Sequence, residues 1–185
     1  IHLKFKINPD MAIFGKALGS GFAINAIIGK KKIMQKAENT FISSTFWSDR
    51  IGPTAALATL EEMGQIKSWN IITKKGIYLR KKWISIAKKY NLDLKLYGIP
   101  SLSAFIINSP RFLEYKTYIT QEMLKKNFLA SNSVYLSVAH EKKIIDNYLY
   151  ELDKIFKIIG ECEQGRNIYG LLESPVCISG FKRLN

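Results

Sequence analysis

The pattern of apolar and polar positions changes once, near the middle of the chain. Before that point, short apolar runs alternate with glycine-rich and hydroxyl-rich loops, and helical spacing follows. The apolar run at residues 11–14 predicts a short buried strand, and the run at residues 22–28 predicts a second strand. Small apolar residues over 54–63 predict a closely packed helix, and a longer helix is expected over 65–90 with a bend at Gly76.

After residue 91 the pattern is that of a small α+β domain. Residues 92–96 alternate apolar and polar positions, which is typical of a strand with one solvent-facing side. Apolar residues at spacings of three and four over 141–159 predict an amphipathic helix, and Gly160 suits its C-terminal end. The other elements expected here are a strand over 102–107, a helix over 112–126 and short strands over 128–130 and 134–138.

The composition is that of a globular protein. Of the 185 residues, 47% are hydrophobic and 12% aromatic, which is enough to bury a core. No apolar run approaches the roughly 20 residues that a membrane-spanning helix needs, and the first residues show no signal-peptide pattern. We therefore expect a cytoplasmic protein. Because the chain starts at Ile1 rather than Met and enters regular structure at once, we also expect a preceding N-terminal portion.

Cysteine and histidine are scarce. The two cysteines, Cys162 and Cys177, do not make a disulfide framework, and together with His2 and His140 they lack the spacing of a metal site. We therefore expect no bound metal.

The net charge of +13 raises nucleic-acid binding as a function. The basic residues are spread over many short clusters, including 30–32, 80–82 and 142–143, and most fall on expected helix surfaces. Solvated helix faces account for this distribution better than a single nucleic-acid surface does. A basic nucleic-acid-binding module is therefore the less favoured alternative, and we expect no nucleic-acid or membrane partner.

The residues around Lys16 are the first candidate for chemistry. Lys16 follows the apolar run at 11–14, and Gly15, Gly19 and Gly21 surround it. Burial at the end of a strand disfavours an ammonium ion, which leaves a lysine there more nucleophilic. Such an amine can form a Schiff base with a carbonyl, including the aldehyde of pyridoxal phosphate. On pattern alone, a surface lysine in an ordinary turn is the alternative.

A second candidate is the hydroxyl-rich run Ser43, Ser44 and Thr45. Hydroxyl and backbone N–H groups that precede a helix can hold a phosphate. The same groups are common in ordinary loops and as helix caps, and on the pattern alone this is the favoured interpretation.

These two stretches together resemble one protein family. Residues 8–22 contain Pro-Asp, a few apolar residues, Gly-Lys and a glycine-rich turn, and they are similar to the Schiff-base lysine segment of the class III pyridoxal-phosphate aminotransferases. Residues 40–46 and 55–60 are similar to the next family segment. Within the family, the chain looks most like glutamate-1-semialdehyde 2,1-aminomutase and the aminotransferases associated with surface-polysaccharide synthesis.

The resemblance implies a fold, a cofactor and site residues. It implies the C-terminal part of a type I pyridoxal-phosphate-dependent transferase fold, of the α/β class, with pyridoxal 5′-phosphate as cofactor. Lys16 would form the Schiff base and move protons on a small amine or carbonyl substrate, and Thr45 would bind the cofactor phosphate across a homodimer interface. The implied regions are the remainder of the large cofactor-binding domain with an interdomain helix at 1–91, a small α+β domain at 92–160 and an irregular tail at 161–185.

Two departures from the family pattern limit what the resemblance implies. The family segments that hold the cofactor ring and its pyridine nitrogen precede the lysine segment and have no counterpart in this chain. Residues 129–140 look shorter than the matching aminomutase stretch and contain no glutamate. We therefore expect amino-group transfer by a transaminase or an aminomutase-like enzyme, with this chain inactive alone. The alternative is a non-catalytic remnant that only folds or dimerises.

Overall fold

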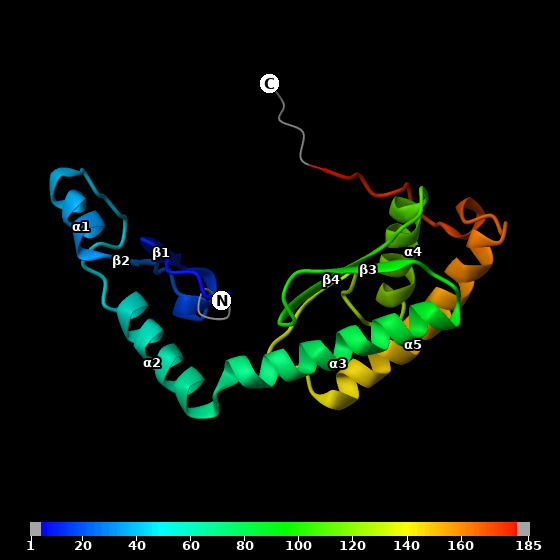
Figure 1. Cartoon of the computed structure of the whole chain (residues 1–185), viewed down its shortest axis with the longest axis horizontal. Helices are drawn as coiled ribbons and strands as arrows, with labels where there is room; N and C mark the ends of the chain where they lie inside the picture. The colour runs from blue at the N-terminus through cyan, green and yellow to red at the C-terminus, as the bar shows by residue number, and fades with distance from the viewer. Residues whose placement is uncertain (1–4, 181–185) are drawn as a thin grey trace, which may run out of the picture. The chain divides into compact units, whose positions relative to one another are not determined.

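The computed structural model describes residues 5–180. Contacts within the chain divide it into two compact units, residues 1–67 and residues 68–185, and each has its own sheet and helices (Figure 1). The long helix after residue 67 belongs entirely to the second unit. The division of the protein into domains at residue 91 stays a prediction.

The first unit is built on a two-stranded antiparallel sheet. Strand β1 (Met11–Phe14) pairs with β2 (Ala26–Gly29), and Ile13 lies opposite Ile27. The connection between the strands contains the 3-10 helix η1 (Lys16–Gly19). The helices that follow are α1 at Lys31–Met34, the 3-10 helix η2 at Gln35–Asn39 and α2 at Ile51–Ile66.

The prediction for β1 is confirmed in position and wrong in burial. Met11, Ile13 and Phe14 are 48%, 68% and 43% exposed. A two-stranded sheet gives each strand a single neighbour and has too little surface to bury its own side chains. The apolar side chains of β1 are therefore exposed in this chain.

The second unit has a three-stranded antiparallel sheet with helices packed around it. The strand order is β3-β4-β5, with β4 (Leu102–Ile107) in the centre and β3 (Leu94–Tyr97) and β5 (Ser133–Tyr135) at the edges. The helices are α3 at Ser68–Lys89, α4 at Phe112–Leu124 and α5 at Lys142–Glu163. Helices α3 and α5 lie side by side (Figure 1) and both contribute to the core.

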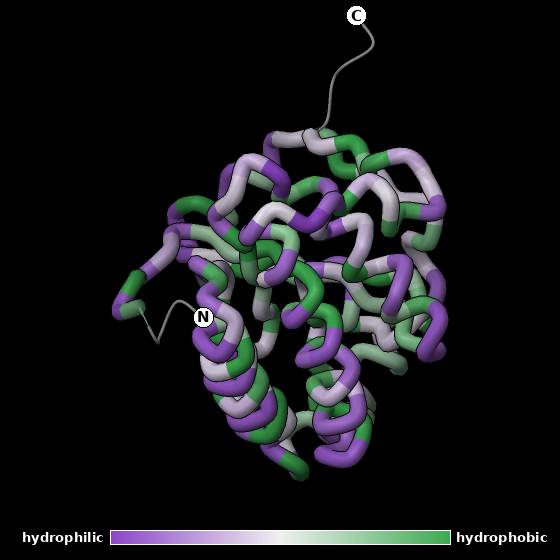
Figure 2. The backbone as a smooth tube through the Cα atoms, turned by 90° about the vertical axis from the view of Figure 1, so that its right-hand side faces the viewer, coloured by the Kyte–Doolittle hydropathy of each residue, from purple (hydrophilic) through white to green (hydrophobic). Residues whose placement is uncertain are grey.

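Aromatic side chains from α3, β4 and α5 form the centre of this core. The rings of Trp83 and Phe105 meet edge to face with their centroids 4.8 Å apart, and Phe105 meets Phe156 in the same way at 5.6 Å. All three side chains are fully buried. Hydrophilic and hydrophobic residues alternate along the helical turns (Figure 2), as expected for helices with one face on a core.

Most elements predicted for the second unit are confirmed, with shifted ends. The strand over 102–107 is β4, and the helix over 141–159 is α5, which extends to Glu163. The predicted strand over 128–130 is not formed. Instead, the N–H of Phe128 donates to the carbonyl of Met123 at 3.0 Å, which ends α4.

The boundary between the two long helices differs from the prediction. It was expected at Gly64, but α2 continues to Ile66. The helix ends where Lys67 adopts a left-handed conformation with a φ of 50°, and α3 begins at the next residue. A left-handed residue is a common helix terminator, although glycine is the usual residue there. A lysine in this role could not be recognised from the sequence.

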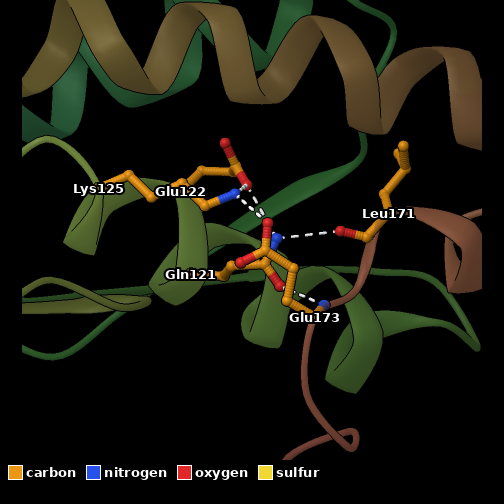
Figure 3. Close-up of polar contacts among 5 residues, drawn as sticks. All are labelled: Gln121, Glu122, Lys125, Leu171 and Glu173. Atoms are coloured by element: carbon orange, nitrogen blue, oxygen red, sulfur yellow. Dashed lines mark hydrogen bonds and ion pairs between the residues drawn. The ribbon is translucent and has the colours of Figure 1, made fainter.

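The segment that follows α5 is irregular and yet fastened to α4 (Figure 3). Apart from the 3-10 helix η3 (Tyr169–Leu171), it has no regular structure up to residue 180. Gln121 donates from Nε2 to the carbonyl of Leu171 at 2.9 Å and accepts from the N–H of Glu173 at 2.8 Å. Lys125 forms an ion pair with Glu173 at 2.6 Å.

Candidate functional site

The turn around Lys16 has an uncommon backbone conformation. Lys16 comes two residues after the end of β1 and has a φ of 53°, in the left-handed region. This region costs an L-residue about 1–2 kcal/mol relative to a right-handed one. The turn closes with a hydrogen bond from the N–H of Leu18 to the carbonyl of Gly15 at 3.2 Å and one from Ser20 to Ala17 at 3.1 Å. Strained positions of this kind are common at functional sites.

Three glycines allow a short segment to pack tightly against this turn. A Cβ atom at Gly19 would lie 2.7 Å from Cγ2 of Ile24, and one at Gly15 would overlap Oδ1 of Asn25. A Cβ atom at Gly52, in the first turn of α2, would lie 2.7 Å from the carbonyl oxygen of Ala23. The residues 23–25 therefore hold the Lys16 turn and the start of α2 together.

A cavity of about 660 Å³ opens beside this packing. It is lined by Lys16, Phe22, Ala23, Ile24, Asn25, Ile27, Ile42, Ser43, Ser44, Phe46, Trp47, Asp49, Gly52 and Pro53. The structure thus places Lys16 and two residues of the second candidate stretch, Ser43 and Ser44, around one cavity. The cavity combines one amine, two hydroxyls, an amide, a carboxylate and several aromatic rings.

Thr45 does not line this cavity, although its neighbours Ser44 and Phe46 do. It lies in an exposed turn that includes a hydrogen bond from the N–H of Asp49 to the carbonyl of Phe46 at 3.2 Å. Its proposed role in binding phosphate across a dimer interface stays a prediction, because a single chain provides only one side of such a site.

Lys16 itself is exposed in this chain. The sequence argument for a reactive amine assumed a buried strand before it, and neither β1 nor Lys16 is buried here. The argument for Lys16 therefore rests on the left-handed turn and on the groups that share its cavity.

Asp49 and Asn25 also line the cavity. The sequence left open whether Asp49 pairs locally or lines a substrate pocket, and it gave no indication of Asn25. Asp49 accepts a hydrogen bond from the N–H of Ile51 at 2.8 Å and so satisfies a donor at the start of α2. The spacing of an aspartate just before a helix could have indicated this. Asn25 lies in an apolar run, and nothing in the pattern indicated its contact with Gly15.

A strong polar cluster lies within the second unit, around Glu163. The carboxylate accepts hydrogen bonds from Ser109 Oγ at 2.9 Å, from Arg111 Nη2 at 3.2 Å and from the Tyr115 hydroxyl. Burial raises the pKa of Glu163, but the hydrogen bonds from Tyr115 and Ser109 and the charge of Arg111 outweigh burial and lower it. Burial and the hydrogen bond to Glu163 raise the pKa of Tyr115. The cluster ties the start of α4 to the end of α5.

The described residues were also compared with what a membrane-spanning helix and a metal site require. None of the helices within residues 5–180 is long and apolar enough to cross a membrane. The same residues contain no group of three or more histidine, cysteine, aspartate or glutamate side chains that could hold a metal ion. The expectation of no metal in the protein stays a prediction.

The fold is that of the type I pyridoxal-phosphate-dependent transaminases. The FumI protein of Sphingopyxis sp. MTA144, solved in its pyridoxal-phosphate internal aldimine form, matches 92% of this chain and 42% of its own, with a TM-score of 0.80 and 20% sequence identity. Residues 2–106 match the family described as Aminotransferase class-III. The chain belongs to this family.

Two curated relatives are similar to this chain in sequence. Glutamate-1-semialdehyde 2,1-aminomutase of Methanococcus maripaludis is 27% identical over an alignment of 170 residues that covers 83% of this chain and 40% of the relative. The 3-aminobutyryl-CoA aminotransferase of Cloacimonas acidaminovorans is 31% identical over 97 residues, which are 52% of this chain and 23% of the relative. The chain thus spans about 40% of the length of the aminomutase it matches. These findings confirm the predicted family, fold class and cofactor, pyridoxal 5′-phosphate.

The residues present fit part of a pyridoxal-phosphate site. An amine for the aldehyde and hydroxyl groups for polar contacts share one cavity, and the turn that carries the amine is packed through glycines. The cavity contains no arginine and no second lysine. It therefore contains an amine of the kind that forms a Schiff base and only part of the polar contacts that a phosphorylated ring needs.

Proposed function

We propose that this chain is part of a longer polypeptide that transfers amino groups with pyridoxal phosphate, as a transaminase or an aminomutase-like enzyme. Lys16 is the residue that binds the cofactor aldehyde as a Schiff base. The observation that carries this proposal is the left-handed conformation of Lys16 in a cavity that it shares with Ser43 and Ser44. Membership of the class III family supports the reaction class.

Pyridoxal phosphate, when bound, supplies an aldehyde for covalent attachment and a ring that withdraws electrons from the substrate. Lys16 supplies an amine nucleophile at Nζ. Once this amine is free again, it can accept a proton from the substrate carbon and return it elsewhere, as a general base and acid. The aromatic side chains of Phe46 and Trp47 line part of the same cavity.

Thr45 and the second subunit complete the proposal. We place the Thr45 hydroxyl at the cofactor phosphate of a partner subunit, so that a homodimer is needed for a complete site. The exposed position of Thr45 in a turn beside the cavity is compatible with such a contact. The cytoplasmic location and the division into a large and a small domain are further parts of the same proposal.

The substrate is proposed only as a class, a small amine or carbonyl compound. The relatives act by name on glutamate 1-semialdehyde and on 3-aminobutyryl-CoA, and these differ widely in size and charge. By resemblance, the stretch 129–140 looks shorter than the matching aminomutase stretch, and it contains no glutamate. The proposal therefore does not commit to the mutase reaction or to its substrate.

The assignment of Lys16 is tested by replacing it in the full-length polypeptide. Lys16→Ala should abolish both amino-group transfer and the reducible covalent adduct with pyridoxal phosphate, which borohydride treatment and mass spectrometry detect. Lys31→Ala, in the exposed helix α1, is the matched control and should retain both. An adduct of undiminished yield in the Lys16→Ala protein would contradict the proposal.

The non-catalytic alternative is tested with the same reagents. If the protein only folds or dimerises, the full-length polypeptide forms no reducible adduct with added pyridoxal phosphate at any position. The isolated 185-residue chain is expected to show no turnover, because the residues that hold the cofactor ring are not among its own. Turnover by the purified chain would show that its own cavity is sufficient.

A further inference from the structure

Asn25 lies directly before β2, and its side chain packs against Gly15, the residue that precedes Lys16. A Cβ atom at Gly15 would overlap the Oδ1 atom of Asn25. Gly15 has a φ of −165°, an extended conformation that other residues also adopt. The contact with the Asn25 side chain, rather than the backbone conformation, is therefore what a side chain at position 15 would meet in this structure.

Gly15 is held from two directions. The Asn25 side chain contacts its Cα side, and its carbonyl accepts the hydrogen bond from Leu18 at 3.2 Å. The next residue is Lys16, in the unfavourable left-handed region. A rotation of the peptide between Gly15 and Lys16 would change the direction in which the Lys16 side chain leaves the backbone.

Asn25 and Lys16 line the same cavity. Asn25 is exposed, and among residues 5–180 its amide makes no hydrogen bond to another side chain or to the backbone. Removing it therefore breaks no hydrogen bond within residues 5–180, and what it contributes there is its contact with Gly15 and its place in the cavity wall.

We propose that Asn25 is a positioning residue for Lys16, and that through Gly15 it sets the direction in which Lys16 Nζ enters the cavity. This inference rests on the proposed function, in which Lys16 attacks the aldehyde of pyridoxal phosphate. In that step a carbon–nitrogen double bond replaces the carbonyl, the two amine protons and the carbonyl oxygen leave as water, and no oxidant or reductant takes part.

The test measures how fast the full-length polypeptide attaches added pyridoxal phosphate at residue 16. Samples are quenched with borohydride at increasing times, and the labelled peptide is quantified by mass spectrometry. The expected size of the effect follows from geometry, because misplacing a reacting group by about 1 Å can lower the rate on the order of 100-fold.

Asn25→Ala should therefore react roughly 10- to 100-fold more slowly than the unchanged protein. Asn39→Ala, the same change at an exposed asparagine of the same unit, should react at the original rate.

A double variant separates positioning from a general effect on the fold. Gly15→Ala alone should slow attachment, because its Cβ atom overlaps Asn25 Oδ1. In Gly15→Ala/Asn25→Ala the obstructing atom is gone, so attachment should be faster than in Gly15→Ala alone. The urea midpoint of Asn25→Ala should equal that of the unchanged protein. The absence of this recovery, or a lower midpoint that accounts for the slower attachment, would overturn the proposal.

The outcomes distinguish this inference from the proposed function. If Lys16→Ala still forms the adduct, the assignment of Lys16 is wrong and the inference fails with it. If Lys16→Ala forms no adduct while Asn25→Ala reacts at the original rate, the function stands and the role of Asn25 is overturned.

Discussion

Gly76 of α3 lies directly against Pro100, in the turn that leads into β4, and a Cβ atom at Gly76 would overlap the Pro100 carbonyl group. Helix α3 continues through this glycine, from Ser68 to Lys89, and the bend expected there stays a prediction. The glycine is needed because the backbones of the helix and the turn approach each other too closely for any side chain. Gly76 therefore determines how near α3 can come to the sheet of the second unit.

Gly76→Ala should destabilise the protein by about 1–3 kcal/mol, because overpacking forces the backbone of the helix or of the turn to move. Urea denaturation followed by tryptophan fluorescence measures the change, since Trp83 is fully buried in the same unit. Gly64→Ala is the matched control, a helical glycine with no atom within 4 Å of a Cβ. Gly64 lies in the first unit, so Gly64→Ala should not lower the urea midpoint that Trp83 reports. A lower midpoint in both variants would contradict this account.

Thr45→Val should weaken the binding of pyridoxal phosphate to the full-length polypeptide while leaving the covalent chemistry at Lys16 in place. Valine keeps the shape of threonine and removes the hydroxyl donor. A hydrogen bond to a charged group contributes about 1.5–3 kcal/mol, so the dissociation constant should rise roughly 10- to 100-fold. Titration of the cofactor into the apoprotein measures this.

Thr120→Val is the control for that change, because within residues 5–180 the Thr120 hydroxyl donates to the carbonyl of Lys116 in α4 and to no other group. It should leave the cofactor affinity unchanged. If Thr45→Val has the affinity of this control, Thr45 does not bind the phosphate.

Lys16 shows which part of the candidate site could be predicted from the sequence. Its place between an apolar run and several glycines is local information, and the resemblance of residues 8–22 to the family's lysine segment is local as well. The packing of Asn25 on Gly15 and of Ala23 on Gly52 joins residues that are ten to twenty-nine positions apart, and no periodicity records such contacts. The burial expected for β1 was wrong because burial depends on what covers a strand, which the strand's own residues do not specify.

The second unit was predicted more completely, because its helices and strands carry apolar faces that are visible in the local sequence. In α5, for example, Leu152, Phe156 and Ile159 are fully buried. Helix ends depended on single residues and were predicted less well. Lys67 terminates α2 in a left-handed conformation, and a lysine gives no signal of that.

Gln121→Ala should release the segment that follows η3 from α4. Gln121 makes two hydrogen bonds to the backbone of this segment, at Leu171 and Glu173, and each contributes roughly 0.5–1.5 kcal/mol. Limited proteolysis should therefore cut the segment after residue 171 faster than in the unchanged protein. Gln65→Ala, at an exposed position of α2, should not alter this cleavage. Equal cleavage rates in both variants would show that the other contacts of the segment, such as the Lys125–Glu173 ion pair, suffice to hold it.

Glu163→Gln should make the stability of the protein less dependent on pH in the acidic range. The pKa of Glu163 is lowered in the folded protein: burial raises it, but the donors Tyr115 and Ser109 and the charge of Arg111 outweigh burial. A carboxyl group whose folded pKa is depressed stabilises the protein above its unfolded pKa of about 4.3, and this contribution is lost as the pH falls through the folded pKa. Glu163→Gln should therefore lower the free energy of unfolding at about pH 7, and the difference from the unchanged protein should shrink towards about pH 3.

Urea denaturation at a series of pH values measures this difference. Glu61→Gln, at an exposed position of α2, is the control. A difference that stays constant from neutral to acidic pH would mean that the charge of Glu163 does not contribute to stability.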